Sequence, residues 1–532
     1  MKETLRQSMA WLHTWSGLLL GWLIFAMFLT GTASYFRPEI TRWMQPETGQ
    51  PAALAVAAAT AQAHLTRVAP DARSWHIGLP DERQSVMRVS WQPQPKPGEK
   101  EVRGRRGRGG GRGMSADLDP GTGAVVAPRD TRGGDFFFRV HYQMHYIPVQ
   151  YGEWLAGAAA MLMLAAIVSG VITHKRIFAD FFTFRPKKAA QRAWLDAHNL
   201  TAVLALPFHL MITYTGLVCL MPALMPWGIK TNFPSERAYY AAMFPRYEMP
   251  ARTGQAAPLM PIPQVIAKAQ AVWGGGRPKM IMVENPGDSA ARVSVVRHSG
   301  DQLAHDGGLL LFDGVSGALL AEPPRHGPAV VTNHVLFGLH MGRFSAPVLR
   351  WLYFLSSLAG CAMVATGLVL WTVKRRKNLP DPACPHFGFR LVERLNIGTI
   401  AGVPAGMAAV LWANRLLPVG MEGRAAWEVH SFFITWPFMI LYACLRPARR
   451  AWVEGLALAA TMIAALPIVS AITAPNRSLV RSLINGDAAM VAFDLTLLAL
   501  GAGLAFCAYK AGAYQPAARP VRRRAVHAAA GV

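Results

Sequence analysis

The feature that most constrains this chain is a series of eight apolar runs that divide it along its whole length. An α-helix needs about 20 consecutive apolar residues to cross the hydrocarbon core of a bilayer. Composition agrees, because 52% of the 532 residues are hydrophobic and only 16% are charged, against about 25% charged in soluble domains. The runs predict a mainly α-helical, polytopic membrane protein with spans at about 11–36, 150–173, 197–221, 350–373, 398–418, 427–445, 452–474 and 489–509.

Basic residues are concentrated after every second run, and this indicates the orientation of the chain. Such clusters mark cytoplasmic loops, so we expect both termini to lie in the cytoplasm. The net charge of +24 is then a topology signal with membrane lipid as its partner, and nucleic-acid binding is not expected. The clusters are Lys175 to Arg192, Lys374 to Lys377, Arg446 to Arg450, and Lys510 with Arg522 to Arg524.

The first run has a second interpretation, a cleaved signal peptide. Lys2 and Arg6 would form its basic start, and Thr32-Ala33-Ser34 is small enough for cleavage. The run is longer than the apolar part of a signal peptide, which is about 7–15 residues, and it carries a histidine that recurs in a later run. We therefore expect it to be retained as a transmembrane helix.

The two long loops each predict a small α+β module on the outer side of the membrane. A helical pattern at 52–68 precedes alternating patterns near 74–79 and 85–91, and one at 263–272 precedes strands near 279–283, 291–297 and 309–312. Gly104–Gly113 is expected to be a flexible Gly/Arg-rich insertion. The expected parts are helix one (1–36), the first module (37–149), helices two and three (150–221), the second module (222–349), helix four with a basic loop (350–390), four C-terminal helices (391–510) and a basic tail (511–532).

The first 378 residues contain an internal repeat of histidines and glycines. His13 precedes Gly31 by 18 residues, and His198 precedes Gly216 by the same number. A looser match relates His145, 25 residues before Gly170, to His340, 27 residues before Gly367. The repeat predicts two similar halves, which also occur in transporters.

Histidines inside or beside membrane spans are candidates for function, because ionisable groups are costly there. Their depths form two layers, and two imidazoles from facing helices can bind one haem iron. We predict two b-type haems, with His13 and His198 as axial ligands in one layer and His145 and His340 in the other. Secondary candidates are His174, His141, His334 and His209. A lone histidine at a membrane interface is as often only an anchor.

Other cofactor chemistries lack their motifs. No CxxC occurs among the five cysteines, which argues against iron–sulfur clusters and zinc ribbons. His141 and His145 share a helical face and could bind a metal directly, but no HExxH is present. No Walker A loop, hydrolase serine elbow, or FAD or NAD motif is seen, so the electron donor would be a quinol, a small reductant or another protein.

Several motifs together resemble the PepSY-associated transmembrane family. They are Trp11-Leu12-His13-Thr14-Trp15-Ser16-Gly17-Leu18 leading to Thr30-Gly31, the module Pro263–Leu320, Leu339-His340-Met341-Gly342-Arg343, and Tyr353 to Thr366-Gly367-Leu368. The resemblance covers about residues 1–378. It implies that the two modules are PepSY-like and periplasmic and that the protein lies in a bacterial inner membrane. It also implies a relation to iron-regulated inner-membrane proteins and ferric-siderophore reductases, in which transmembrane histidines hold haem.

The expected function is that of a haem-containing ferric-siderophore reductase, which passes electrons across the inner membrane to a periplasmic ferric siderophore or other iron chelate. Two alternatives remain open at this point. One is a PepSY-type binding or regulatory protein without redox activity, and the other is a siderophore transporter. A further haem near His430 in the C-terminal helices is also open at this point.

Overall fold

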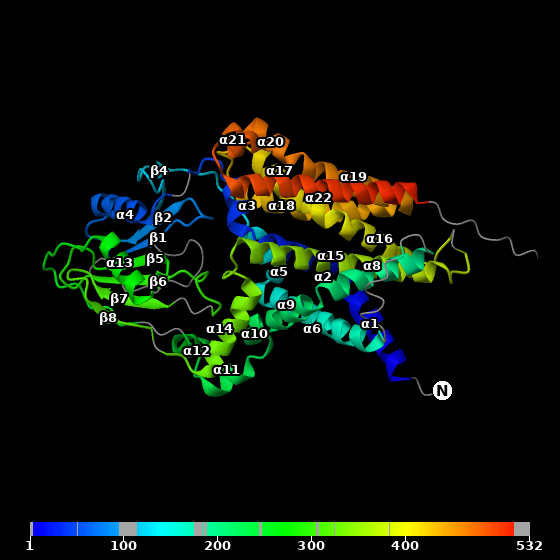
Figure 1. Cartoon of the computed structure of the whole chain (residues 1–532), viewed down its shortest axis with the longest axis horizontal. Coiled ribbons are helices and arrows are strands. Elements are labelled where there is room, and N and C mark those ends of the chain that lie inside the picture. Colours follow the sequence, from blue (N-terminus) through cyan, green and yellow to red (C-terminus); the bar gives the residue numbers. More distant parts are fainter. Residues whose placement is uncertain are drawn as a thin grey trace, which may run out of the picture.

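A computed structural model describes residues 4–49, 52–94, 114–174, 185, 189–243, 247–304, 308–323, 325–381 and 384–514. Gly104–Gly113, most of the basic stretch 175–188 and the tail from residue 515 lie outside these residues. Figure 1 shows an elongated molecule with a helical bundle along its length and a β-sheet at one end. We call these the sheet end and the far end of the molecule.

The helical part makes this a multi-pass membrane protein. Within the described residues, six helices or continuous helix pairs are long and apolar enough to span a membrane, and two strongly bent pairs raise the number to eight. Every predicted span coincides with one of them. The bounds are α1 Leu5–Leu19, α2 Gly21–Ser34, α6 Val149–Thr173, α8 Ala190–Leu204, α9 Leu206–Cys219, α15 Pro347–Arg376, α16 Phe387–Ile400, α17 Gly402–Leu416, α18 Arg424–Leu445, α19 Ala448–Ala464, α20 Leu466–Thr473 and α22 Ala488–Ala513.

Two spans bend sharply in the middle, which the sequence did not predict. The α1–α2 pair bends by 65° and the α8–α9 pair by 67°. The second bend has a local cause, because Pro207 at the start of α9 lacks the N–H that a continuous helix would use. At the first bend, a Cβ on Gly21 would lie 2.8 Å from Leu368 Cδ2, so glycine lets α15 approach closely.

Among the remaining helices, α4 and α13 pack on the sheet, and the others lie around the bundle (Figure 1). The bounds of all the remaining helices are α3 Arg37–Met44, α4 Leu54–Val68, α5 Asp135–Gln143, α10 Met221–Leu224, α11 Trp227–Asn232, α12 Glu236–Met243, α13 Ile262–Val272, α14 Pro328–Met341, the short 3₁₀ helix Pro475–Arg477 and α21 Leu479–Ile484.

The predicted repeat is visible in the helix contacts. In the first half α1 contacts α6 and α2 contacts α5, while in the second half α8 contacts α15 and α9 contacts α14. The halves also exchange contacts, since α6 packs on α9 and α15 packs on α2. The two halves therefore interlock rather than stand side by side.

The two predicted modules form one continuous sheet. Its eight antiparallel strands have the order β4-β3-β2-β1-β5-β6-β7-β8. The halves meet where β1 pairs with β5, with Ile77 opposite Ile281. The separate modules expected from the sequence are therefore joined edge to edge. The bounds are β1 Ser74–Gly78, β2 Met87–Gln92, β3 Met114–Leu118, β4 Val125–Val126, β5 Pro278–Glu284, β6 Arg292–Arg297, β7 Leu309–Asp313 and β8 Leu319–Ala321.

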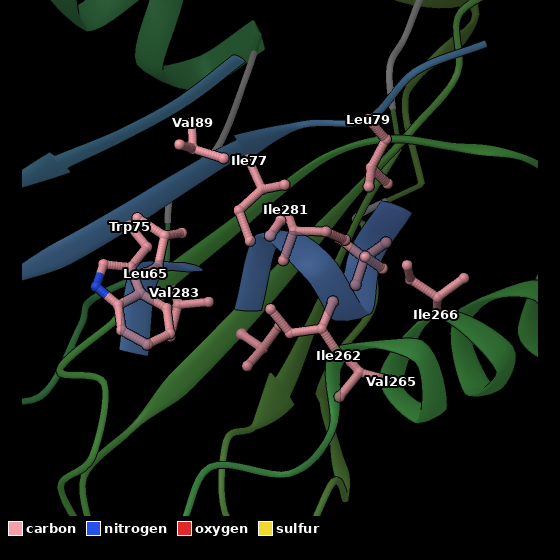
Figure 2. Close-up of a cluster of buried hydrophobic side chains, with 14 of the residues drawn as sticks. Leu65, Trp75, Ile77, Leu79, Val89, Ile262, Val265, Ile266, Ile281 and Val283 are labelled. Atoms are coloured by element: carbon pink, nitrogen blue, oxygen red, sulfur yellow. The ribbon is translucent and has the colours of Figure 1, made fainter. Parts of the chain in front are cut away.

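One core holds the joined sheet together. Strand residues alternate, so that one set faces the apolar sides of α4 and α13. Figure 2 shows Leu65 of α4, Ile262 of α13, and Ile77 and Ile281 of the two seam strands in this cluster. The last two side chains are fully buried, and the core therefore crosses the seam between the halves.

A buried carboxylate fixes the turn between β5 and β6. Asp288 accepts hydrogen bonds from the backbone N–H groups of Ala290, Thr253 and Gly254 and from the Thr253 hydroxyl. Burial alone would raise the pKa of Asp288, but these hydrogen bonds outweigh it and lower the pKa to about 2. The ionised carboxylate thus ties the segment before α13 to the sheet.

Candidate functional site

Four histidines form two facing pairs in the bundle. His13 of α1 and His198 of α8 have ring centroids 6.1 Å apart, with 68° between the ring planes. His141 of α5 and His340 of α14 have centroids 6.3 Å apart, with 32° between the planes. We call the first the far pair and the second the sheet-side pair, from their helices' positions in Figure 1. Each pair takes one histidine from each half of the repeat.

All four imidazoles are held in the same way. In each, Nδ1 lies 2.7–3.0 Å from a backbone carbonyl of a neighbouring helix. A carbonyl can only accept, so Nδ1 must carry the proton and Nε2 keeps its free lone pair. The acceptors are Ala166 for His13, Met363 for His198, Met27 for His141 and Ile212 for His340.

A glycine lies against each imidazole, four residues after the accepting carbonyl. A Cβ at any of the four would lie 2.9–3.1 Å from the histidine Cε1, closer than an ordinary contact. A Ser or Thr precedes each glycine, and its hydroxyl donates back into the same helix turn. The pairs are Thr30-Gly31 at His141, Ser169-Gly170 at His13, Thr215-Gly216 at His340 and Thr366-Gly367 at His198.

This donor set suits a metal that brings most of its own ligands. No group of three or more His, Cys, Asp or Glu side chains that could hold a metal ion is found among the described residues. Two imidazoles on opposite sides of one metal have centroids about 6 Å apart, since each metal–nitrogen bond is about 2 Å and a ring nitrogen lies about 1 Å from its ring centre. The observed spacings fit this, and a haem iron needs only two axial protein ligands.

The structure brings together one of the two predicted pairs and rearranges the other. His13 meets His198 as expected, but His340 faces His141 rather than His145. Helix α5 ends at Gln143, and both Met144 and His145 have left-handed backbone with φ of 57° and 63°. His145 is thereby turned away and stacks on Phe433 of α18, with 5.7 Å between centroids.

The other secondary candidates lie apart from the pairs. His174 accepts a hydrogen bond at Nε2 from Asn199. His334 is buried on α14 and lies edge-on to His326. His209 is fully buried on α9, edge-on to Phe28, and its Nε2 lies 3.3 Å from the Ser356 carbonyl.

His430, the candidate ligand of a further haem, faces Tyr146. The Tyr146 hydroxyl bonds to Nδ1 of His430, and the two rings are stacked. The contact joins the α5–α6 connection to α18. A second imidazole facing His430 is not found in the part of the chain that the structure describes.

Buried ion pairs connect the C-terminal helices to the rest, and sequence reasoning missed them. Arg42 of α3 binds Asp487 at 2.7 Å, and both side chains are only 4% exposed. Arg424 and Glu428 of α18 form a fully buried pair, and Thr131 donates to Glu428. Since unpaired charges in such places are costly, these contacts fix the C-terminal helices against α3 and the start of α5.

Comparison with known proteins assigns the chain to a family. The PepSY-associated TM region family matches residues 10–374, which include both histidine pairs and the sheet. A Pseudomonas aeruginosa protein that is itself uncharacterized is 27% identical over 389 residues, covering 69% of this chain and 93% of its own length. The family match extends over well more than half of the sequence, and the chain belongs to the PepSY-associated TM region family.

Proposed function

We propose that the protein is a haem-binding electron carrier that transfers electrons along the bundle to a ferric chelate at the sheet end. The observation that carries the proposal is the pair of facing histidine sites, each with free Nε2 lone pairs and the same support. Four-fold repetition of the Nδ1 contact and of the adjacent glycine is not needed for simple interface anchors. It is what two equivalent axial ligand sites require.

Backbone carbonyls and glycines of neighbouring helices would hold in place the histidine side chains that bind each haem. A bound haem would supply an iron that takes up and releases one electron at a time. Each Nδ1–carbonyl bond orients an imidazole and holds its tautomer, so that Nε2 is the donor atom. Each glycine lets the carbonyl-bearing helix approach the ring. The apolar helices around the pairs keep water away, which tunes the potential of an iron centre.

The two pairs lie at different depths, as a route along the bundle requires. From the bend to the glycine of the sheet-side pair, α2 and α9 each run 11 residues, from Leu20 to Gly31 and from Ala205 to Gly216, which is about 16 Å of helix. His209, Phe28 and Phe208 fill the space along α9 with aromatic rings. One electron per ferric ion must enter at the far pair. Its donor would be a quinol or a protein.

The direction of transfer follows from the distribution of charge. Lys374, Arg375 and Arg376 end α15, and Arg446 and Lys510 lie at the ends of α18 and α22. In Figure 1 these helix ends lie at the far end of the molecule. By the positive-inside rule the far end is cytoplasmic and the sheet end periplasmic, so a chelate at the sheet end would be reduced outside the cytoplasm.

The experiment is a haem titration on purified variants. Wild-type protein from haem-replete cells should contain about two haems by pyridine haemochrome, since two pairs are present. His141→Ala should lose the sheet-side haem, while His145→Ala, four residues away, should keep both. His13→Ala and His198→Ala should each affect the other haem only.

The result also separates the proposal from its rivals. A colourless protein from haem-replete cells would overturn it in favour of a regulatory protein or a transporter. Loss of haem in His145→Ala but not in His141→Ala would instead restore the pairing inferred from spacing. Ferric-chelate reduction in vesicles, with reductant on one side only, then tests the direction of transfer.

A further inference from the structure

A cavity of about 210 Å³ opens at the sheet end beside α5. Arg132, Arg139, Gln143 and His145 line it, with Phe136 and Val429 at its apolar side. The lining residues of α5 recur every three or four positions and so share one face of the helix. His141 lies two residues from Arg139, which places it on a different face, where its Nδ1 contacts Met27 of α2. Helix α5 thus separates the cavity from the sheet-side pair.

The cavity carries an excess of positive charge. Arg132 and Arg139 are both exposed, and neither guanidinium has a carboxylate partner in the structure as far as the described residues go. The one carboxylate in the lining, Asp135, forms an ion pair with Arg37 at 3.1 Å. Two unpaired guanidinium groups at one opening can bind carboxylates through paired N–H donors.

The backbone at the rim is strained in a way that shapes the opening. Met144 and His145 are consecutive non-glycine residues with positive φ, a conformation that costs free energy and is often found at functional sites. It turns His145 out of the line of α5 and onto Phe433, so that the ring borders the cavity instead of extending the helix.

We propose that this cavity binds the carboxylate groups of a small anionic iron chelate. The inference rests on the proposed function and names its substrate class: an oxygen-donor chelate with net negative charge, held by Arg132 and Arg139 one helix away from the sheet-side pair. The position suits an acceptor, since only α5 lies between the bound chelate and His141.

The test uses gallium(III) citrate, because gallium forms an oxygen-donor chelate like that of ferric iron and is not reduced. The full-length chain in phosphatidylcholine nanodiscs is dialysed against it, and bound gallium is measured by mass spectrometry. We expect the double variant R132Q/R139Q to bind at least tenfold more weakly and R132K/R139K to be intermediate, because lysine lacks the paired donors. Binding to the wild type should weaken as salt rises.

Arg88→Gln is the matched control. Arg88 is exposed like the cavity arginines but lies on the sheet, paired with Asp117 at 2.7 Å, so its loss should leave gallium binding unchanged. Equal affinity in wild type and R132Q/R139Q would overturn the proposal. A second result would also overturn it: added phosphatidylglycerol displaces gallium citrate, and retention of that lipid depends on the two arginines. The cavity would then be a lipid headgroup site.

Thermal unfolding midpoints equal to that of the wild type show that the variants are folded, and haem content, measured on the same samples, separates the two proposals. A colourless protein that binds gallium citrate through Arg132 and Arg139 keeps the anion site and overturns the haem. A protein that contains two haems, and whose gallium binding is unchanged when both arginines are replaced, supports the haem proposal and overturns the anion site.

Discussion

Replacing the glycine against one imidazole should disturb one haem and leave the other intact. In Gly31→Ala the new Cβ would lie 2.9 Å from both Cε1 and Nδ1 of His141. To restore an ordinary contact of 3.4 Å or more, the ring must move by about half an ångström. That displacement stretches or breaks the 2.7 Å bond from Nδ1 to the Met27 carbonyl.

The expected size of the effect follows from that hydrogen bond. The bond contributes about 1 kcal/mol net, close to the 1.4 kcal/mol that changes an affinity tenfold. Loss of the hydrogen bond that supports a metal-bound histidine typically lowers metal affinity or activity by about 10- to 100-fold. We expect Gly31→Ala to release its haem to apomyoglobin roughly tenfold more readily than wild type and to shift one of two reduction potentials. Gly170→Ala should do the same to the haem of the far pair, through His13.

Gly17→Ala is the control for this experiment. Gly17 lies in α1, one turn after His13, and a Cβ there meets nothing within 4 Å. Alanine favours a helix over glycine by up to about 1 kcal/mol, so none of the three variants should unfold. If Gly31→Ala and Gly17→Ala release haem at the same rate with the same potentials, the inferred support of the imidazoles is wrong.

Three further predictions concern stability. Asp487→Asn should lower the thermal unfolding midpoint clearly in a detergent melting assay, because removing one partner of a buried pair with Arg42 costs roughly 3–5 kcal/mol; an unchanged midpoint would mean that the pair is not formed. Ile281→Ala at the seam should cost roughly 2–5 kcal/mol, whereas Val125→Ala on an exposed edge strand should cost little, and similar losses would contradict the shared core. Because the pKa of Asp288 is lowered to about 2, its stabilising effect is complete above its ordinary value near 4 and is lost as the pH falls toward 2; Asp288→Asn should therefore unfold at a midpoint that varies less with pH in that range.

The sequence predicted the helices and strands better than the way in which they pair and bend. Apolar run lengths located every span, and alternation located five of the eight described strands, because these signals are local. The union of β1 with β5 was missed, since an edge strand and a central strand of a small sheet carry the same alternation. The bends were also missed, although Pro207 was a visible signal for one of them.

The candidate site was predicted in part for a similar reason. Spacing could not decide between His141 and His145. They lie 29 and 25 residues before Gly170, and the corresponding spacing in the second half, from His340 to Gly367, is 27. The deciding fact is where α5 ends, which depends on the left-handed Met144. A usable signal was the phenylalanine three residues before the histidine, since Phe138 precedes His141 as Phe337 precedes His340, whereas Tyr142 stands at that position before His145.

Each histidine pair contains one member from each half of the repeat, and this has an evolutionary consequence. A single half would hold two unmatched histidines, so an unduplicated ancestor could complete its sites only as a homodimer. Fusion into one chain frees the halves to diverge. In the middle of the bundle, Ile24 of the first half packs with Met163. The equivalent positions of the second half are His209 and Gly360, and a Cβ on this glycine would lie 3.2 Å from the imidazole Nε2. A homodimer would have to place that imidazole twice, whereas the fused chain keeps it on one side only.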